Sequence, residues 1–324
     1  MTQLTLVIPN RAPGRPTIAV VEKAAVESEQ AVPKVAVHPE NEEATEAWSG
    51  VLFDRFIAYR DLVVQGLKAH SDAAMALEPP APGDRVLDIG CGFGDTTQQL
   101  AALVGADGHA TGVDVSEPFI EASIAEASDG GVDNVDFFTT DVQVGDLRGP
   151  YDYAFSRMGV MFFANPVQAL RNVREALRPG GHLVAVVWRR KLDNEWLHRA
   201  EQVAEKYLEE PEEPEDVRCG PGPFSMANAD TVSDQLQIAG FERPTLTRCD
   251  LPITIGNDLD HAVEFNMALG PAAELLRICP ADQVARLRPK VQAEIREVLA
   301  DYQQPDGAVR APASTWIVRA TAPE

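Results

Sequence analysis

A glycine-rich segment that follows an acidic residue is the part of this sequence whose spacing could bind a charged ligand. Asp88 opens the pattern Asp-x-Gly-x-Gly-x-Gly, which ends at Gly94 and lies between a short apolar run and a helical stretch. Glycine lets the backbone approach a ligand where a Cβ atom would collide. A dinucleotide fingerprint has the different spacing G-x-G-x-x-G and does not require the preceding acid. Because a carboxylate here would repel a diphosphate, the pattern favours a ligand with an ammonium group.

Two further carboxylates follow the next two apolar runs. Asp114 stands about 20 residues after the last glycine, where an acid can accept hydrogen bonds from both hydroxyls of a ribose. Asp141 follows the third run, where a polar group can meet an adenine edge while Val142 lies against the ring. Since open α/β sheets bind ligands at the carboxyl ends of their strands, we expect these acids and the glycine turn to form one site.

A parallel sheet is needed to bring these residues together, and the chain has the pattern of one. Short apolar runs alternate with helical stretches, which predicts strands joined by crossover helices. The expected strands are 85–89, 110–115, 135–139, 153–156 and 182–188, and the helices between them are 95–103, 118–127 and 167–177. A helix at 42–70 precedes the sheet, and helices at 229–239, 259–276 and 281–302 and strands at 245–255 and 315–320 follow it.

Five segments resemble the class I S-adenosylmethionine-dependent methyltransferases, particularly the group that includes the ubiquinone and menaquinone C-methyltransferases. They are residues 86–94, 112–116, 140–142, 151–163 and 177–188, and the similarity extends over about residues 41–190. The resemblance implies an α/β, Rossmann-like fold of seven mostly parallel strands with helices on both faces, closed by an antiparallel hairpin. It also implies S-adenosyl-L-methionine as the cofactor, with its methionine part in the glycine turn and its ribose on Asp114.

The residues expected at the cofactor come from the glycine turn and from the ends of the next strands. They are Asp88, Gly90, Cys91, Gly92, Gly94, Thr96, Asp114, Val115, Asp141, Val142 and Ser156. Cys91 is interpreted as a small side chain that packs under the turn rather than as a nucleophile, and no metal site is expected. Asp88 has a second interpretation, in which it only caps the turn or the following helix. Trp48 either stacks near the cofactor or packs in the protein.

Methyl transfer depends mainly on placement of the acceptor, and a base is needed only if the acceptor must lose a proton. Arg157, at the end of the fourth expected strand, is either part of the site or one half of a structural ion pair. His198 and His261 fall in the segments expected to cover the site, where each could be a base or a plain polar helix residue. These three are the candidate catalytic residues.

Two segments, residues 190–228 and 257–310, are expected to form a helical cap on the acceptor side, the second inserted near the C-terminus. Their apolar side chains include Phe224, Met226, Phe265, Met267, Leu269, Leu275 and Leu276. Ligand pockets are usually apolar with a few polar groups that orient the ligand. The cap therefore predicts a small, partly apolar acceptor, and it leaves open whether oxygen, nitrogen, sulfur or carbon is methylated.

The charge and composition argue against polyanionic partners. The 324 residues contain 28 Lys and Arg and 50 Asp and Glu, a net charge of −22, which disfavours nucleic acid and anionic membranes. The four cysteines of the sequence form no CxxC pair, and no apolar run is long enough to span a membrane. Because a signal-peptide pattern is also absent, we expect a cytoplasmic protein. Residues 1–40, with five prolines, are interpreted as a disordered tail. Residues 41–324 are interpreted as one domain, in a protein that is a monomer or a homodimer. The acidic run 209–215 is interpreted as a solvated loop.

Two other functions are compatible with parts of the pattern. An NAD-dependent oxidoreductase would have a similar fold, but the glycine spacing and Asp88 argue against it. A regulatory protein that binds the cofactor without turnover would keep the same three acids. The sequence alone does not separate such a protein from an enzyme.

Overall fold

A seven-stranded sheet is the centre of the structure, a computed structural model that describes residues 35–209 and 221–324. The strand order is β3-β2-β1-β4-β5-β7-β6. The strands are β1 (Arg85–Ile89), β2 (His109–Asp114), β3 (Val135–Thr139), β4 (Tyr151–Arg157), β5 (Leu177–Trp188), β6 (Glu242–Gly256) and β7 (Val309–Thr321). The first five are parallel, and β7 pairs antiparallel with both β5 and β6. The fold class predicted from the sequence is confirmed.

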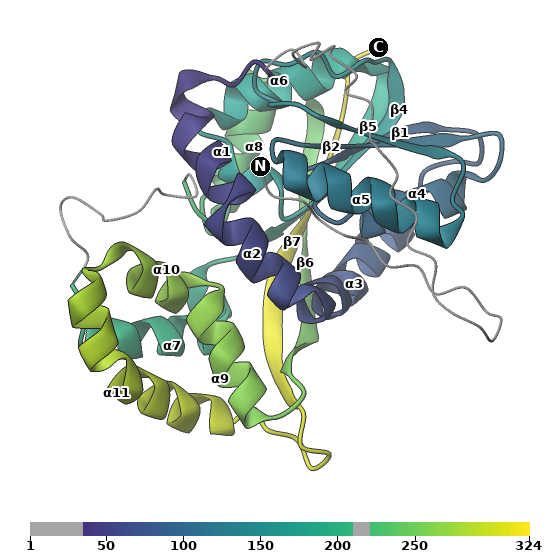
Figure 1. Cartoon of the computed structure of the whole chain (residues 1–324). Helices are drawn as coiled ribbons and strands as arrows, with labels where there is room; N and C mark the ends of the chain where they lie inside the picture. Colours follow the sequence, from purple (N-terminus) through teal and green to yellow (C-terminus); the bar gives the residue numbers. More distant parts are fainter. Residues whose placement is uncertain (1–34, 210–220) are drawn as a thin grey trace, which may run out of the picture. The chain divides into compact units, whose positions relative to one another are not determined.

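Helices cover both faces of this sheet (Figure 1). One face carries α3 (Arg60–Leu77), α4 (Asp95–Val104) and α5 (Glu117–Gly130), and the other carries α6 (Pro166–Ala176) and α8 (Ala229–Ile238). Along β5, Val184 and Val186 belong to one buried core, whereas Leu183 and Val187 belong to the other. A strand buried on both faces must be apolar at successive positions, which is why residues 183–188 of β5 form an unbroken apolar run.

The segment expected as one helix at 42–70 is three helices. A short 3₁₀ turn (Pro39–Asn41) leads into α1 (Glu42–Ser49) and α2 (Val51–Ala58), and α3 then extends to Leu77. The first break falls at Gly50, whose φ of −120° and ψ of −109° lie outside the helical region. Because the chain changes direction at each break, α1 and α2 do not continue the line of α3 (Figure 1).

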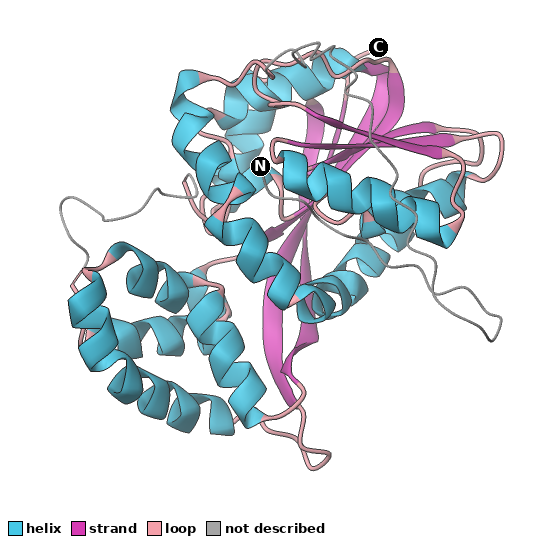
Figure 2. Ribbon diagram, in the orientation of Figure 1, coloured by secondary structure: helices cyan, strands magenta, loops and turns pink. Residues whose placement is uncertain are grey.

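Strands β6 and β7 continue beyond the other strands and carry the cap (Figure 2). The far ends of these two strands share one buried core with α7 (Glu195–Glu205), α9 (Leu259–Ala268), α10 (Pro271–Ile278) and α11 (Ala281–Ala300). The helix expected at 259–276 is divided, because Gly270 has a φ of +103° and Pro271 begins a new helix. Most of the acidic run 209–215 lies outside the described residues.

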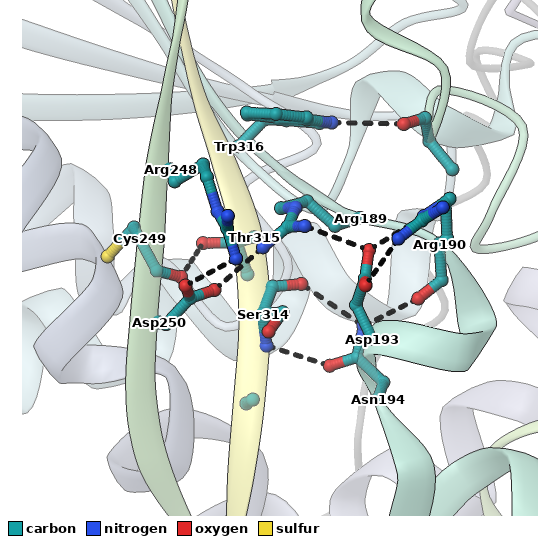
Figure 3. A network of polar contacts seen from close by, with 12 residues as sticks. Arg189, Arg190, Asp193, Asn194, Arg248, Cys249, Asp250, Ser314, Thr315 and Trp316 are labelled. Carbon is teal, nitrogen blue, oxygen red and sulfur yellow. Dashed lines mark hydrogen bonds and ion pairs between the residues drawn. The ribbon is translucent and has the colours of Figure 1, made fainter.

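A buried arginine joins the cap to the sheet (Figure 3). Arg189, only 6% exposed, directly follows β5, and its guanidinium nitrogens lie 3.0 Å from the Asp193 carboxylate and 2.9 Å from that of Asp250. The Asn194 side chain accepts a hydrogen bond from the backbone N–H of Ser314 at 2.8 Å and donates one to its carbonyl at 3.1 Å. These contacts hold the segment between β5 and α7 against β6 and β7.

We predict that Asn194→Ala lowers the free energy of unfolding by about 1–3 kcal/mol, because the buried N–H of Ser314 loses its acceptor and the Ser314 carbonyl keeps only the Arg189 N–H as a donor. Urea denaturation followed by circular dichroism measures the change. The exposed Asn257 provides a control, since Asn257→Ala should change stability by less than about 0.5 kcal/mol. Equal stability of both variants would contradict a role for Asn194 in fixing the cap.

Candidate functional site

The glycine turn after β1 lies at the edge of the sheet where the parallel strands end. Gly90, Gly92 and Gly94 all have positive φ values, of 66°, 54° and 76°. A Cβ on Gly90 would lie 2.8 Å from the Cα of Gly159, so this glycine is required by close packing of two loops. A Cβ on Gly92 would meet no atom within 4 Å, and Gly92 lines a cavity. The turn therefore presents bare backbone to a ligand at Gly92.

Asp114, at the end of β2, lies across the turn from Gly92. Its Oδ2 accepts a hydrogen bond from the Gly92 N–H at 3.1 Å, and its Oδ1 accepts one from the Ser116 N–H at 3.0 Å. Burial raises the pKa of Asp114. A carboxylate has about four acceptor positions, so two remain for the hydroxyls of a ligand in the cavity that Asp114 lines. This geometry suits the ribose expected here.

Asp88 does not reach the cavity. It is fully buried, and its Oδ2 accepts hydrogen bonds from the hydroxyls of Thr96 at 2.7 Å and Thr97 at 2.6 Å. Burial raises its pKa to about 6, although the two hydroxyls partly offset this. The structure therefore places Asp88 under the turn, where it holds the first turn of α4. The expected direct contact with an ammonium group is corrected in favour of the capping interpretation.

An ion pair beside the turn, rather than Asp88, presents charged groups to the cavity. Arg157 donates to both oxygens of Asp95, each at 2.8 Å, and the two side chains are 9% and 20% exposed. Both residues line the cavity, so Arg157 forms the expected structural ion pair at the cavity wall, and its role in catalysis stays a prediction. A cation and an anion side by side complement a zwitterion such as the methionine part of S-adenosylmethionine.

Asp141 is bonded to the N-terminal segment of the domain. Its carboxylate accepts hydrogen bonds from the Asn41 amide at 3.1 and 2.9 Å, from the His38 N–H at 2.9 Å and from the Gln143 N–H at 2.9 Å. The expected contact with an adenine edge would have to share these oxygens. Residues 35–40, expected as part of a tail, thus contact the domain, while residues 1–34 lie outside the described part of the chain.

The cavity has a volume of about 730 Å³ and extends from the glycine turn to the cap. Of the expected cofactor residues, its lining includes Gly90, Cys91, Gly92, Thr96, Asp114, Val115, Asp141 and Val142. Gly94 and Ser156 are not in the lining: Gly94 packs against Ser123 and Phe137, and Ser156 donates to the Ile89 carbonyl at 2.8 Å. Burial raises the pKa of Cys91 well above its ordinary value, which argues against a thiolate nucleophile.

The two candidate histidines do not line the cavity. His198 lies 4.0 Å from Glu201, and His261 stacks on Tyr59 with ring centroids 5.9 Å apart. Trp48, in contrast, both packs and lines the cavity, with its ring 5.3 Å from that of Phe56. The structure therefore supports the polar-helix interpretation of both histidines.

The cavity is also lined by polar side chains that were not predicted from the sequence, among them Asn41, Asp95, Lys191 and Glu201. Asp95 directly follows the glycine motif, which was a usable signal for a site residue. Asn41, Lys191 and Glu201 lie far from the motif, and only folding brings them to the same cavity. In residues 35–209 and 221–324, no helix is long and apolar enough to cross a membrane, and no cluster of potential metal ligands occurs.

The sheet order, the glycine turn after β1 and the acid at the end of β2 define a Rossmann-like domain of the methyltransferase type. A family model described as a methyltransferase domain matches residues 80–218. The chain thus carries a class I, S-adenosylmethionine-dependent methyltransferase domain, and the family and cofactor predicted from the sequence are confirmed.

Curated relatives share this part of the chain. The nocamycin O-methyltransferase of Saccharothrix syringae is 31% identical over 141 residues, which cover 41% of this chain and 48% of the relative. An aklanonic acid methyltransferase from a Streptomyces species is 32% identical, over 33% of this chain and 49% of the relative. The chain thus spans about half the length of the curated relatives it matches.

The solved structure of the YcgJ protein from Bacillus subtilis has the same fold. It is 17% identical, with a TM-score of 0.52 over 79% of this chain and 99% of that protein. A putative methyltransferase from Bacillus halodurans is similar to the same extent, with a TM-score of 0.51 at 14% identity, over 79% of this chain and 100% of that protein.

We predict that Asp88→Asn becomes progressively more stable, relative to the unchanged protein, as the pH rises from about 4 to about 7. In the folded protein Asp88 keeps its proton to about pH 6, compared with an ordinary pKa of 3.8. The unfolded chain loses this proton first, so the contribution of Asp88 to stability falls with rising pH across that window. Melting temperatures of both proteins across the pH range measure the difference, and a constant difference would contradict the raised pKa.

We predict that Asp114→Ala weakens the binding of S-adenosylhomocysteine by about 1–3 kcal/mol, the usual loss for a buried charged acceptor. Titration calorimetry measures the affinity. Asp107→Ala, at an exposed turn before β2, is the control and should leave the affinity unchanged. Equal affinity of Asp114→Ala and the unchanged protein would refute the ribose assignment.

Proposed function

We propose that the protein transfers the methyl group of S-adenosylmethionine to a small, partly apolar metabolite bound under the cap. One observation carries this proposal: a single cavity joins the glycine turn and Asp114 to the apolar side chains of the cap. A cofactor at the turn and an acceptor under the cap would share that space. A cavity of about 730 Å³ lies within the usual range for small-molecule sites.

The residues at the turn fit the cofactor. The open backbone at Gly92 leaves room for it, Asp114 has acceptor positions left for the ribose, and the Arg157–Asp95 pair complements the methionine part. When bound, the cofactor supplies an activated methyl group on a positively charged sulfur. The protein's own contribution is placement, which can supply about 7–11 kcal/mol for well-oriented partners.

The cap side chains would hold the acceptor and exclude water. Trp188, Trp196, Phe224 and Phe265 line the cavity from β5, α7, the segment before α8, and α9. Exclusion of water keeps it from competing for the methyl group and strengthens the electrostatic contacts inside the cavity. The relatives named for nocamycin and aklanonic acid support a small-molecule acceptor. The cytoplasmic location of the protein and its state as a monomer or homodimer remain predictions.

A cofactor-binding regulatory protein without turnover is the alternative. Incubation of the purified protein with methyl-labelled S-adenosylmethionine and a small-molecule extract separates the two. Label in an extracted metabolite supports an enzyme. Cofactor binding without label in any metabolite would favour the regulatory protein, and label in protein or nucleic acid would contradict the small acceptor.

We predict that Phe224→Ala and Phe265→Ala each raise the Michaelis constant for the labelled acceptor about tenfold, as expected for the loss of a buried aromatic contact. Affinity for S-adenosylhomocysteine should not change. The neighbours Met226 and Met267 point into the cores of the protein and not into the cavity, so Met226→Leu and Met267→Leu are matched controls. An unchanged Michaelis constant in both Phe variants would place the acceptor elsewhere.

A further inference from the structure

The cap half of the cavity is apolar apart from a small number of charged side chains. Its lining between residues 188 and 278 includes the carboxylates of Glu201 and Glu274 and one cation, Lys191, among the residues that the structure describes. Glu274 already accepts two hydrogen bonds from Arg277, at 3.0 and 2.7 Å. Its charge is therefore matched by a partner. Arg55, which lines the cavity from α2, donates a hydrogen bond to the Ala268 carbonyl at 3.3 Å. The other carboxylate of the cap lining, Glu201, pairs with Lys191.

Lys191 lies where an acceptor under the cap would meet it. Its ammonium nitrogen is 2.6 Å from both carboxylate oxygens of Glu201 and 5.8 Å from the centroid of the Phe224 ring. The Lys191 side chain is 35% exposed and that of Glu201 is 12% exposed. An ammonium group has three donors, and one carboxylate does not use them all. Lys191 can therefore donate to a second oxygen beside an aromatic surface.

The backbone of Lys191 is held in place by the contacts that join the cap to the sheet. Lys191 begins a 3₁₀ turn (Lys191–Asp193) that is flanked by Arg189 and Asn194, which bond to β6 and β7 (Figure 3). A cation on a fixed backbone can select a ligand by the position of its negative charge, because little ordering is required on binding.

We propose that Lys191 is a specificity-determining residue that binds an anionic oxygen of the acceptor: a carboxylate, or an ionised phenol or enol, on an apolar body. Glu201 positions the ammonium group and is displaced in part when the acceptor binds. This inference rests on the proposed methyl transfer and narrows its substrate class to apolar organic anions.

An ionised acceptor also fits the chemistry of the cavity. The acceptor oxygen would form the new bond to the methyl carbon while the carbon–sulfur bond breaks and its electron pair stays on sulfur. The products are a neutral methyl ester or ether and a neutral thioether, and no proton has to move. Such a reaction needs no general base, in keeping with two carboxylates on the cap wall that are both bonded to cations.

The test compares two fluorescent probes that share an aromatic framework and differ in charge. Anilinonaphthalene sulfonate is an apolar anion, and phenylnaphthylamine is its neutral counterpart. Both are titrated into the full chain saturated with S-adenosylhomocysteine. We expect Lys191→Met to weaken the binding of the anion about tenfold, the loss of one charge-assisted contact, and to leave that of the neutral probe unchanged.

Three further variants sharpen the result. Lys191→Arg keeps the charge and should restore binding of the anion. Glu201→Gln removes the carboxylate that competes with the anionic probe for Lys191, and should tighten binding of that probe. Lys206→Met is the control, because Lys206 pairs with Glu294 on an exposed surface and does not line the cavity.

Several outcomes would overturn the proposal. They are unchanged anion binding in Lys191→Met, parallel changes for both probes, or an equal loss in Lys206→Met. Because binding of the probes requires no turnover, failure of the proposed function is recognised separately. A chain that binds the anion through Lys191 and labels no metabolite would contradict methyl transfer and retain the anion site.

Discussion

The close approach of two backbone loops at the carboxyl edge of the sheet is the constraint on which the site depends. Gly90, after β1, and Gly159, after β4, leave no space for a side chain between them: a Cβ on Gly159 would lie 2.6 Å from the Ile89 carbonyl oxygen. This contact fixes the path of the turn. The path of the turn positions the Gly92 N–H, which donates a hydrogen bond to Asp114. It also positions the start of α4, where Asp95 pairs with Arg157.

Each acid near the cofactor end is stabilised by a different means. Asp88 is buried against two hydroxyls, Asp114 accepts two backbone N–H groups, Asp95 pairs with Arg157, and Asp141 accepts from Asn41 and two backbone groups. A buried carboxylate is costly unless such partners are present. The carboxylates therefore have different positions: Asp88 supports the turn from below, whereas Asp114 and Asp95 line the cavity.

The cap adds a second, separate chemistry to the same cavity. Its helices come from two parts of the chain but share one core, and the extended ends of β6 and β7 hold that core against the sheet. Because Arg189 and Asn194 fix the connection after β5, the side chains of Lys191 and α7 are placed with respect to the cofactor end. The glycine-turn end of the cavity exposes backbone and carboxylates, and the cap end exposes aromatic side chains and two carboxylates, Glu201 and Glu274, that are each paired with a cation.

The sequence by itself determined the order of the strands and of the helices that connect the first five, the glycine turn and the position of Asp114, because these depend on local periodicity and on the rule that strand ends share one edge of a sheet. Tertiary structure alone decided which side chains enter the cavity. Spacing along the chain could not show that Asp88 points under the turn while Asp95 lines the cavity, that Asn41 reaches Asp141, or that Lys191 rather than a histidine lines the cap wall. The direction of each side chain depends on packing between segments that are distant in the sequence, so it cannot be predicted from neighbouring residues alone.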